Sequence, residues 1–218
     1  MSAQKNGDAS RPDVLLEQTL AMLLPLVRLL VANGATYPQL VAALKPAFLR
    51  AAHAELMASG KRISDSAISI VSGVHRKDVR ALTSEGQVPD RVPPRVQSLV
   101  SEIMVRWSSD PRYAGQDGVP SALPLRGDGS HADDEPSFEQ LAQSVSRDFH
   151  SRAMLEEMLR LGIVEIVDNR AHLRSERSIA DRDFVEMVAS VSRSVHDHLA
   201  AQIAVGATFR PKRPAKVD

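Results

Sequence analysis

The chain opens with a dense run of apolar residues between Asp13 and Ala32. Asp13 is the expected N-cap of a helix over this run, and Gly34 stands where helices commonly end. Pro25 should bend this helix or split it in two, because proline lacks the backbone N–H. The longest uncharged run is well short of the ~20 residues that a membrane span needs. We therefore expect a buried helix of a cytoplasmic protein, with no membrane partner.

A second helix is expected between Thr36, its N-cap, and Gly60. Its expected inner face carries apolar residues at helical spacing, namely Leu40, Val41, Leu44, Phe48, Ala51, Ala52 and Leu56. Two short helices should follow, from Asp65 to Ser72 and from about Arg76 to Ser84. Gly73 separates them, because glycine tolerates the left-handed conformation that a tight turn requires.

Residues 64–82, SDSAISIVSGVHRKDVRAL, carry the structural positions of a helix-turn-helix motif. Gly73 supplies the turn residue, and the small Ser69, four positions earlier, allows the two helices to approach. The expected inward-facing apolar residues are Ile68, Val71, Val74, Val79 and Leu82. The segment therefore has the full set of positions that the motif needs.

The exposed positions of this segment are basic. Between residues 61 and 80, five Lys or Arg stand against two Asp. In helix-turn-helix proteins the start of the second helix enters the major groove, where Arg can pair with guanine and Lys with phosphate. The candidate DNA contacts are Arg76, Lys77 and Arg80 in the groove, with Lys61, Arg62 and His75 on the phosphate backbone. Asp78 fits this charge pattern least well, and we expect it to be a capping partner of His75.

After a proline-rich linker at residues 87–94, the pattern changes to helix, strand, helix, helix and hairpin. The expected elements are helices at 95–108, 137–146 and 151–161, and strands at 122–125, 163–167 and 171–174. This is the order of a winged-helix domain. Residues 155–174, LEEMLRLGIVEIVDNRAHLR, resemble the recognition helix and wing of bacterial winged-helix regulators. The turn before them, residues 146–150, is longer than the common form and has no glycine.

The fold class predicted from these elements is mainly α. A helical helix-turn-helix domain over residues 13–86 precedes a winged-helix α+β domain over residues 95–175, and an amphipathic C-terminal helix spans residues 182–205. Residues 1–12 and 206–218 are expected to be flexible tails.

Charge argues against the winged-helix domain as the main reader of DNA. Residues 127–157 carry eight Asp or Glu and two Arg, and Glu156 and Glu157 lie in its would-be recognition helix. This domain is better suited to contacts with protein, including a second copy of the chain. The C-terminal helix carries an apolar stripe at Phe184, Val188, Val191, Val195 and Leu199. The stripe suits either a homodimer contact or packing on the helix's own domain.

The amino-acid composition excludes several classes of protein function. The 218 residues carry 27 Lys or Arg and 27 Asp or Glu, so the net charge is zero. Cysteine is absent, which excludes disulfides, thiolate-ligated metals and thiol nucleophiles. No phosphate-binding glycine loop, nucleophile elbow or zinc-protease motif is present. We therefore expect no enzyme activity, no cofactor and no metal site. The leading prediction is a transcriptional regulator that binds double-stranded DNA, and the alternative is a protein-interaction adaptor that does not touch DNA.

Four stretches of the sequence resemble an uncharacterised family of bacterial proteins. They are PLVRLLVANGATYPQL, GVHRKDVRAL, WSSDPRY and SFEQLAQSVSRD with the following LRLGIVE, and the likeness spans roughly residues 20–175. The resemblance implies a cytoplasmic bacterial protein with helix-turn-helix character. It implies no activity, ligand or catalytic residue.

Overall fold

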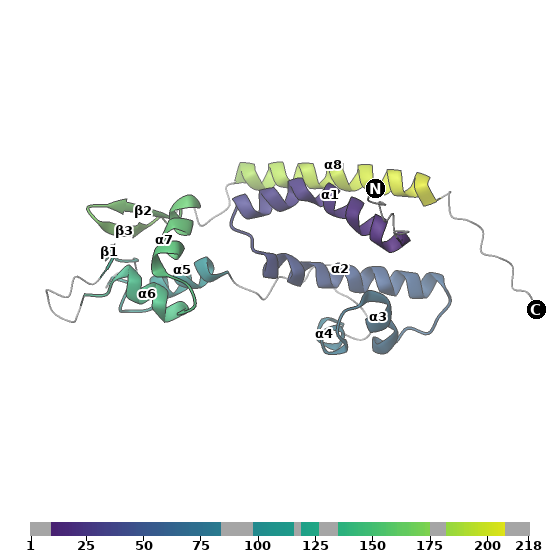
Figure 1. Cartoon of the computed structure of the whole chain (residues 1–218), viewed down its shortest axis with the longest axis horizontal. Coiled ribbons are helices and arrows are strands. Elements are labelled where there is room, and N and C mark those ends of the chain that lie inside the picture. Colours follow the sequence, from purple (N-terminus) through teal and green to yellow (C-terminus); the bar gives the residue numbers. More distant parts are fainter. Residues whose placement is uncertain (1–9, 84–97, 116–118, 127–134, 175–181, 208–218) are drawn as a thin grey trace, which may run out of the picture. The chain divides into compact units, whose positions relative to one another are not determined.

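The computed structural model describes residues 10–83, 98–115, 119–126, 135–174 and 182–207 (Figure 1). The chain divides into two compact units, Met1–Leu173 and Arg174–Asp218. The described residues form eight helices and three strands, so the predicted mainly α fold is confirmed. The linker at 87–94 and the outer parts of both predicted tails lie outside the described residues.

The first two helices both begin with a capping box. Helix α1 spans Arg11–Ala32, and the carboxylate of Asp13 accepts a hydrogen bond from the backbone N–H of Ser10 at 3.1 Å. Ser10 is therefore the N-cap of α1. The prediction that Asp13 is the N-cap was wrong by three residues, because Asp13 is the third residue of the helix and the reciprocal partner of Ser10 in the capping box. Helix α2 spans Tyr37–Ala58, and the predicted N-cap Thr36 is confirmed. Pro25 lies inside α1 without splitting it.

No residue of α1 is buried, so the prediction of a buried helix was wrong. A helix that is apolar around most of its circumference is buried only when other elements pack on several of its sides. The elements of unit Met1–Leu173 do not pack around α1 in this way. Its length and mean hydropathy of 1.8 are sufficient for a membrane span, by those two criteria alone. Among the described residues, α1 is the one helix that meets them.

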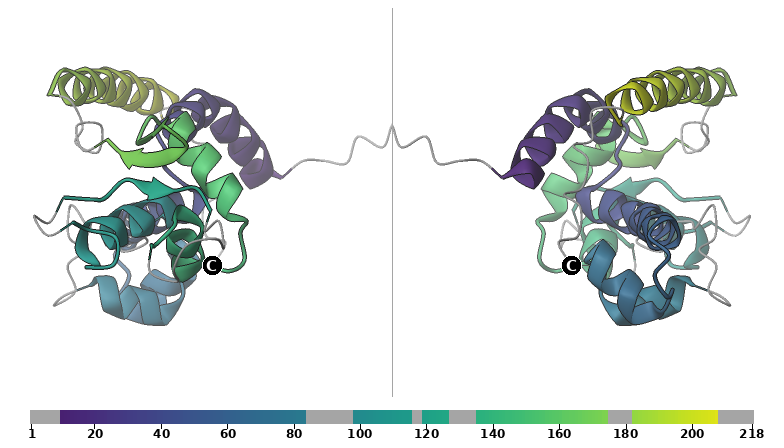
Figure 2. Two further views of the ribbon diagram at one scale, coloured as in Figure 1. Left: turned by 90° about the vertical axis from the view of Figure 1, so that its left-hand side faces the viewer. Right: turned by 90° about the vertical axis from the view of Figure 1, so that its right-hand side faces the viewer.

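Helix α2 buries only part of the predicted face, because Ala52 and Leu56 are buried as predicted and Leu49 is buried in addition. Leu49, Ala52 and Leu56 are in the core, whereas Phe48 is 55 % exposed and Leu44 is also exposed. The reason is that the short helices α3, Asp65–Ser72, and α4, Arg76–Leu82, form a unit with α2 in which α3 packs directly on it. Figure 2 shows these three helices from two further sides.

The second half of unit Met1–Leu173 has the predicted order of helix, strand, helix, helix and hairpin. Its elements are α5 Leu99–Ser109, β1 Leu123–Pro124, α6 Phe138–Val145, α7 Ser151–Arg160, β2 Val164–Val167 and β3 Arg170–Leu173. The three strands form an antiparallel sheet in the order β1-β3-β2. Asp168 and Asn169 have φ values of 50° and 60°, as a two-residue hairpin turn between β2 and β3 requires.

The core of this second half is built around Trp107. Its ring meets that of Phe138 edge-on, with ring centroids 5.8 Å apart, and its indole N–H donates to the carbonyl of Ser121 at 2.9 Å. Tyr113 is also buried, and it lies in the irregular connection between α5 and β1. The irregular stretch is thus held to the core by an aromatic side chain, a feature that helical or strand periodicity cannot reveal.

Helix α8, Arg182–Ala207, lies in the second unit and extends two residues beyond its predicted end. Several residues of its predicted stripe are exposed, namely Val191, Val195 and Leu199.

Candidate nucleic-acid interface

The turn between α3 and α4 is held by local hydrogen bonds. The Ser64 hydroxyl caps α3 by accepting from the N–H of Ala67 at 3.2 Å, and Gly73 ends this helix in the left-handed conformation, with φ 72°. The Ser69 hydroxyl donates to the carbonyl of Val74 at 2.7 Å, which links α3 to the far side of the turn. The predicted helix end and turn residue at Gly73 agree with the structure.

A small core fixes α3 and α4 against α2. Its buried members are Leu49, Ala52, Leu56, Ile68 and Val79, with Ala67, Val74 and Leu82 packed around them. Four of the five predicted inward-facing residues of the motif belong to this cluster, but Val71 is 48 % exposed. Because α3 packs mainly against α2 and α4, its buried stripe is narrow and includes Ile68 without reaching Val71.

All six predicted DNA-contacting residues are exposed. Lys61 and Arg62 lie in the connection between α2 and α3, whereas His75, Arg76, Lys77 and Arg80 lie at the N-cap and along α4. In the described part of the chain, Lys61, Arg62, Arg76 and Lys77 form no ion pair. We call these six residues the basic ridge. Its four unpaired cations are available to phosphate or to base edges.

His75 has a structural role as the N-cap of α4. Its Nδ1 atom accepts a hydrogen bond from the backbone N–H of Lys77 at 3.2 Å. An accepting Nδ1 carries no proton, so the proton of the neutral ring lies on Nε2. The ring therefore presents an N–H donor on the side opposite the cap.

The carboxylate of Asp78 binds Lys45 of α2, with 2.7 Å between Nζ and Oδ2. The prediction that Asp78 is the capping partner of His75 was wrong. The carboxylate of Asp78 is bound by Lys45 instead, and the ring of His75 itself caps α4. The hydrogen bond from Lys45 lowers the pKa of Asp78 below its ordinary value, against an opposing effect of burial. Both side chains are about two-fifths exposed, so the pair contributes at most about 1 kcal/mol to stability.

Asp65, the other acidic residue of the segment, pairs with a member of the basic ridge. The Nε atom of Arg80 lies 3.4 Å from Oδ2 of Asp65, which joins the second helix of the segment to the start of the first. Both acidic residues between positions 61 and 80 are therefore neutralised by basic partners. Sequence reasoning missed Lys45, because its distance of 33 residues from Asp78 leaves no local signal.

The surface of α7 differs from the basic ridge in its charge. Glu156 pairs with Arg152 at 2.9 Å, and Glu157 pairs with Arg160 at 2.7 Å. Two arginines of this predicted recognition helix are thus matched by two carboxylates on the same helix. The prediction that this half of the chain is not the main reader of DNA stays a prediction.

The described residues contain no group of three or more His, Asp or Glu side chains that could hold a metal ion. Together, the fold and the exposed charges define a mainly helical protein with a small antiparallel sheet and a basic surface on its α2–α4 unit. The chain belongs to DUF6502, a family of unknown function, whose model matches residues 14–214. No curated protein and no solved structure matches the chain. The predicted membership of a family of unknown function is confirmed.

Proposed function

We propose that the protein binds double-stranded DNA through α3, the Gly73 turn and α4, used as a helix-turn-helix, and that it acts as a transcriptional regulator. The observation that carries the proposal is the arrangement of charge on a fixed pair of helices. Ile68 and Val79 of the segment are buried in a cluster with α2, its two carboxylates are paired, and four cations remain without a partner among the described residues. Such a surface matches the phosphate backbone of a duplex.

The side chains of the basic ridge have two proposed roles, contact with base edges and contact with phosphates. Arg76 and Lys77 occupy the first two positions of α4, the part of a second helix that meets base edges in the major groove. Arg76 can pair with both acceptors of guanine, while Lys61 and Arg62 bind phosphates beside the groove. His75 donates from Nε2 to a phosphate while its Nδ1 keeps the cap on α4. Arg80 contributes less than Arg76, because Asp65 competes for its guanidinium.

Fluorescence anisotropy on a mixed-sequence duplex tests the proposal. Binding is measured at ~50 and ~200 mM salt for the wild type and for a variant with Arg76→Ala, Lys77→Ala and Arg80→Ala together. Each phosphate contact that is lost should reduce the slope of log K against log salt by about 0.9. We expect steep salt dependence in the wild type and a clearly flatter slope in the triple variant.

A control variant removes the same number of exposed cations elsewhere, through Arg147→Ala, Arg152→Ala and Arg193→Ala. Its salt slope should stay close to that of the wild type. Equal slopes for all three proteins, or no salt-dependent binding at all, would overturn the proposal.

A protein-interaction adaptor is the second candidate, and exposed apolar residues on α3 favour it. Ile70 is 84 % exposed and Val71 is also exposed, within the same helix-turn-helix segment that carries most of the basic ridge. A protein partner would bury these side chains, whereas a DNA backbone would not. An absence of salt-dependent duplex binding in the anisotropy experiment would favour the adaptor over the DNA-binding protein.

We also propose that the protein forms a homodimer through α8, because two-fold symmetry would present two copies of α4 to the half-sites of a palindrome. The exposed stripe Val191, Val195 and Leu199 supports this contact. The cytoplasmic location stays a prediction, since α1 meets the length and hydropathy criteria of a membrane span.

A further inference from the structure

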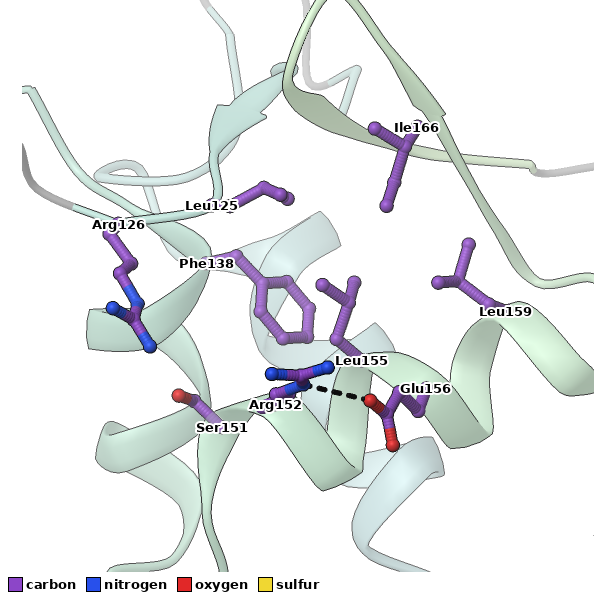
Figure 3. A pocket seen from close by; sticks show the side chains of 9 residues that line it. All are labelled: Leu125, Arg126, Phe138, Ser151, Arg152, Leu155, Glu156, Leu159 and Ile166. Carbon is purple, nitrogen blue, oxygen red and sulfur yellow. Dashed lines mark hydrogen bonds and ion pairs between the residues drawn. The ribbon is translucent and has the colours of Figure 1, made fainter.

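A cavity of about 280 Å³ lies between α7, β2, the end of β1 and the start of α6 (Figure 3). None of the residues of the basic ridge lines it. Nine residues line it: Leu125, Arg126, Phe138, Ser151, Arg152, Leu155, Glu156, Leu159 and Ile166. Their chemistry divides into an apolar interior and a charged rim.

The interior of the cavity is shaped for an apolar body. Phe138 and Leu155 are both buried, and Figure 3 shows their side chains at the centre of the site. Leu125, just after β1, and Ile166 of β2 face them, and Leu159 lies at one side. A dry cavity of ~150 Å³ in a protein core can take up benzene. The space here therefore suffices for one aromatic ring, or a branched alkyl group, together with a substituent.

The rim of the cavity carries a net positive charge. Two arginines, Arg126 and Arg152, line the cavity with a single carboxylate, that of Glu156, which accepts from the Nε atom of Arg152 at 2.9 Å. The Nη groups of Arg152 remain for a second carboxylate, in the planar geometry that guanidinium groups favour. Ser151 is the first residue of the ten-residue helix α7, and no side chain caps the backbone N–H groups of this first turn. The cationic side chains and these N–H groups all favour an anion.

We propose that this cavity binds a small carboxylic acid with an apolar body, such as an aryl or branched aliphatic acid. The apolar body lies against Phe138 and Leu155, and the carboxylate lies between Arg126 and Arg152. The site is a ligand site in the second half of unit Met1–Leu173. It goes beyond the proposed binding of DNA and does not depend on it.

Binding of benzoate to the full chain, without DNA, tests the proposal. Isothermal titration calorimetry gives the affinity, and the fluorescence of Trp107, the sole tryptophan, reports on the site because its ring contacts Phe138. Benzamide has the same ring without the charge, and acetate has the charge without the ring. We expect saturable binding of one benzoate, with benzamide weaker by about 10-fold or more and acetate weaker still.

Variants at the rim and the interior locate the site. Arg126→Ala with Arg152→Ala should weaken benzoate by about 10-fold or more and leave benzamide unchanged. Ile166→Phe, at a partly exposed position on β2, should fill the cavity and weaken both ligands. Arg147→Ala removes an exposed arginine that does not line this cavity and should change neither affinity.

Far-ultraviolet circular dichroism establishes that each variant is folded. The proposal is overturned if benzoate shows no saturable binding, if benzamide binds as tightly as benzoate, or if the arginine variant binds benzoate like the wild type. A loss of DNA binding in the basic ridge leaves these results unaffected, so the two proposals fail separately.

Discussion

Two isoleucines of α3 offer a matched test of how the candidate interface is held in place. Ile68 is 1 % exposed and lies in the core with α2, whereas Ile70, two residues further along the same helix, is 84 % exposed. The substitution Ile→Ala removes the same three carbon atoms at either position. The difference between the two variants therefore isolates the effect of burial.

The expected magnitudes follow from these surroundings. At Ile68, loss of about 0.8 kcal/mol per buried carbon, together with the cavity left behind, should destabilise the α2–α4 unit by about 2–5 kcal/mol. At Ile70, the change should stay within about 0.5 kcal/mol, because the side chain is largely exposed and Ala has the higher helix propensity. The core of this unit has only five buried residues, so the loss at Ile68 is a large part of its stability.

Hydrogen exchange at increasing urea concentration is the appropriate assay, because the chain has more than one unit and a single unfolding transition is not expected. Amides in residues 49–82 should lose protection in Ile68→Ala and keep it in Ile70→Ala. Amides of α5 to α7 serve as an internal reference that neither substitution should change. Equal protection in the two variants, or greater loss in Ile70→Ala, would refute the packing of α3 on α2.

The remaining predictions concern the turn, the ion pair and the C-terminal helix. Gly73→Ala should lower the stability of the α2–α4 unit by about 1–2 kcal/mol, because Ala is strained at the positive φ of this position. A steric clash adds nothing to this cost, since an added Cβ would meet no atom within 4 Å. Gly73→Asn should cost less, because Asn tolerates positive φ better than Ala. The pKa of Asp78 is lowered in the folded protein, so the stability that Asp78 contributes is complete above its ordinary pKa of 3.8 and is lost as the pH falls through the lowered value. The protection of α2–α4 amides against hydrogen exchange in urea should therefore differ between wild type and Asp78→Asn at pH 7 and converge in acid, while a constant difference would contradict the effect of Lys45. Val195→Asp with Leu199→Asp should convert a dimer to a monomer in light scattering, and an unchanged mass would exclude α8 as the contact.

Helix ends and turns were determined largely by the sequence, because their causes are local. Ser64 and Gly73 lie within one turn of the groups that they cap, so the limits of α3 could be predicted to the residue. The hairpin of β2 and β3 was likewise predicted, and its turn residues Asp168 and Asn169 are of types that tolerate positive φ. The exposure of the six residues of the basic ridge was also predicted from the sequence, because charged side chains in connections and on short surface helices are rarely buried.

The tertiary structure decided which faces are buried and which charges are paired. Helical spacing on α2 allowed a face with Phe48 as well as one with Leu49, and the packing of α3 selected the latter. Lys45 meets Asp78 only because α4 folds back towards α2. In each case the partner is far away along the chain. Burial and ion pairing depend on which surfaces meet in space, and residue spacing within one element does not contain that information.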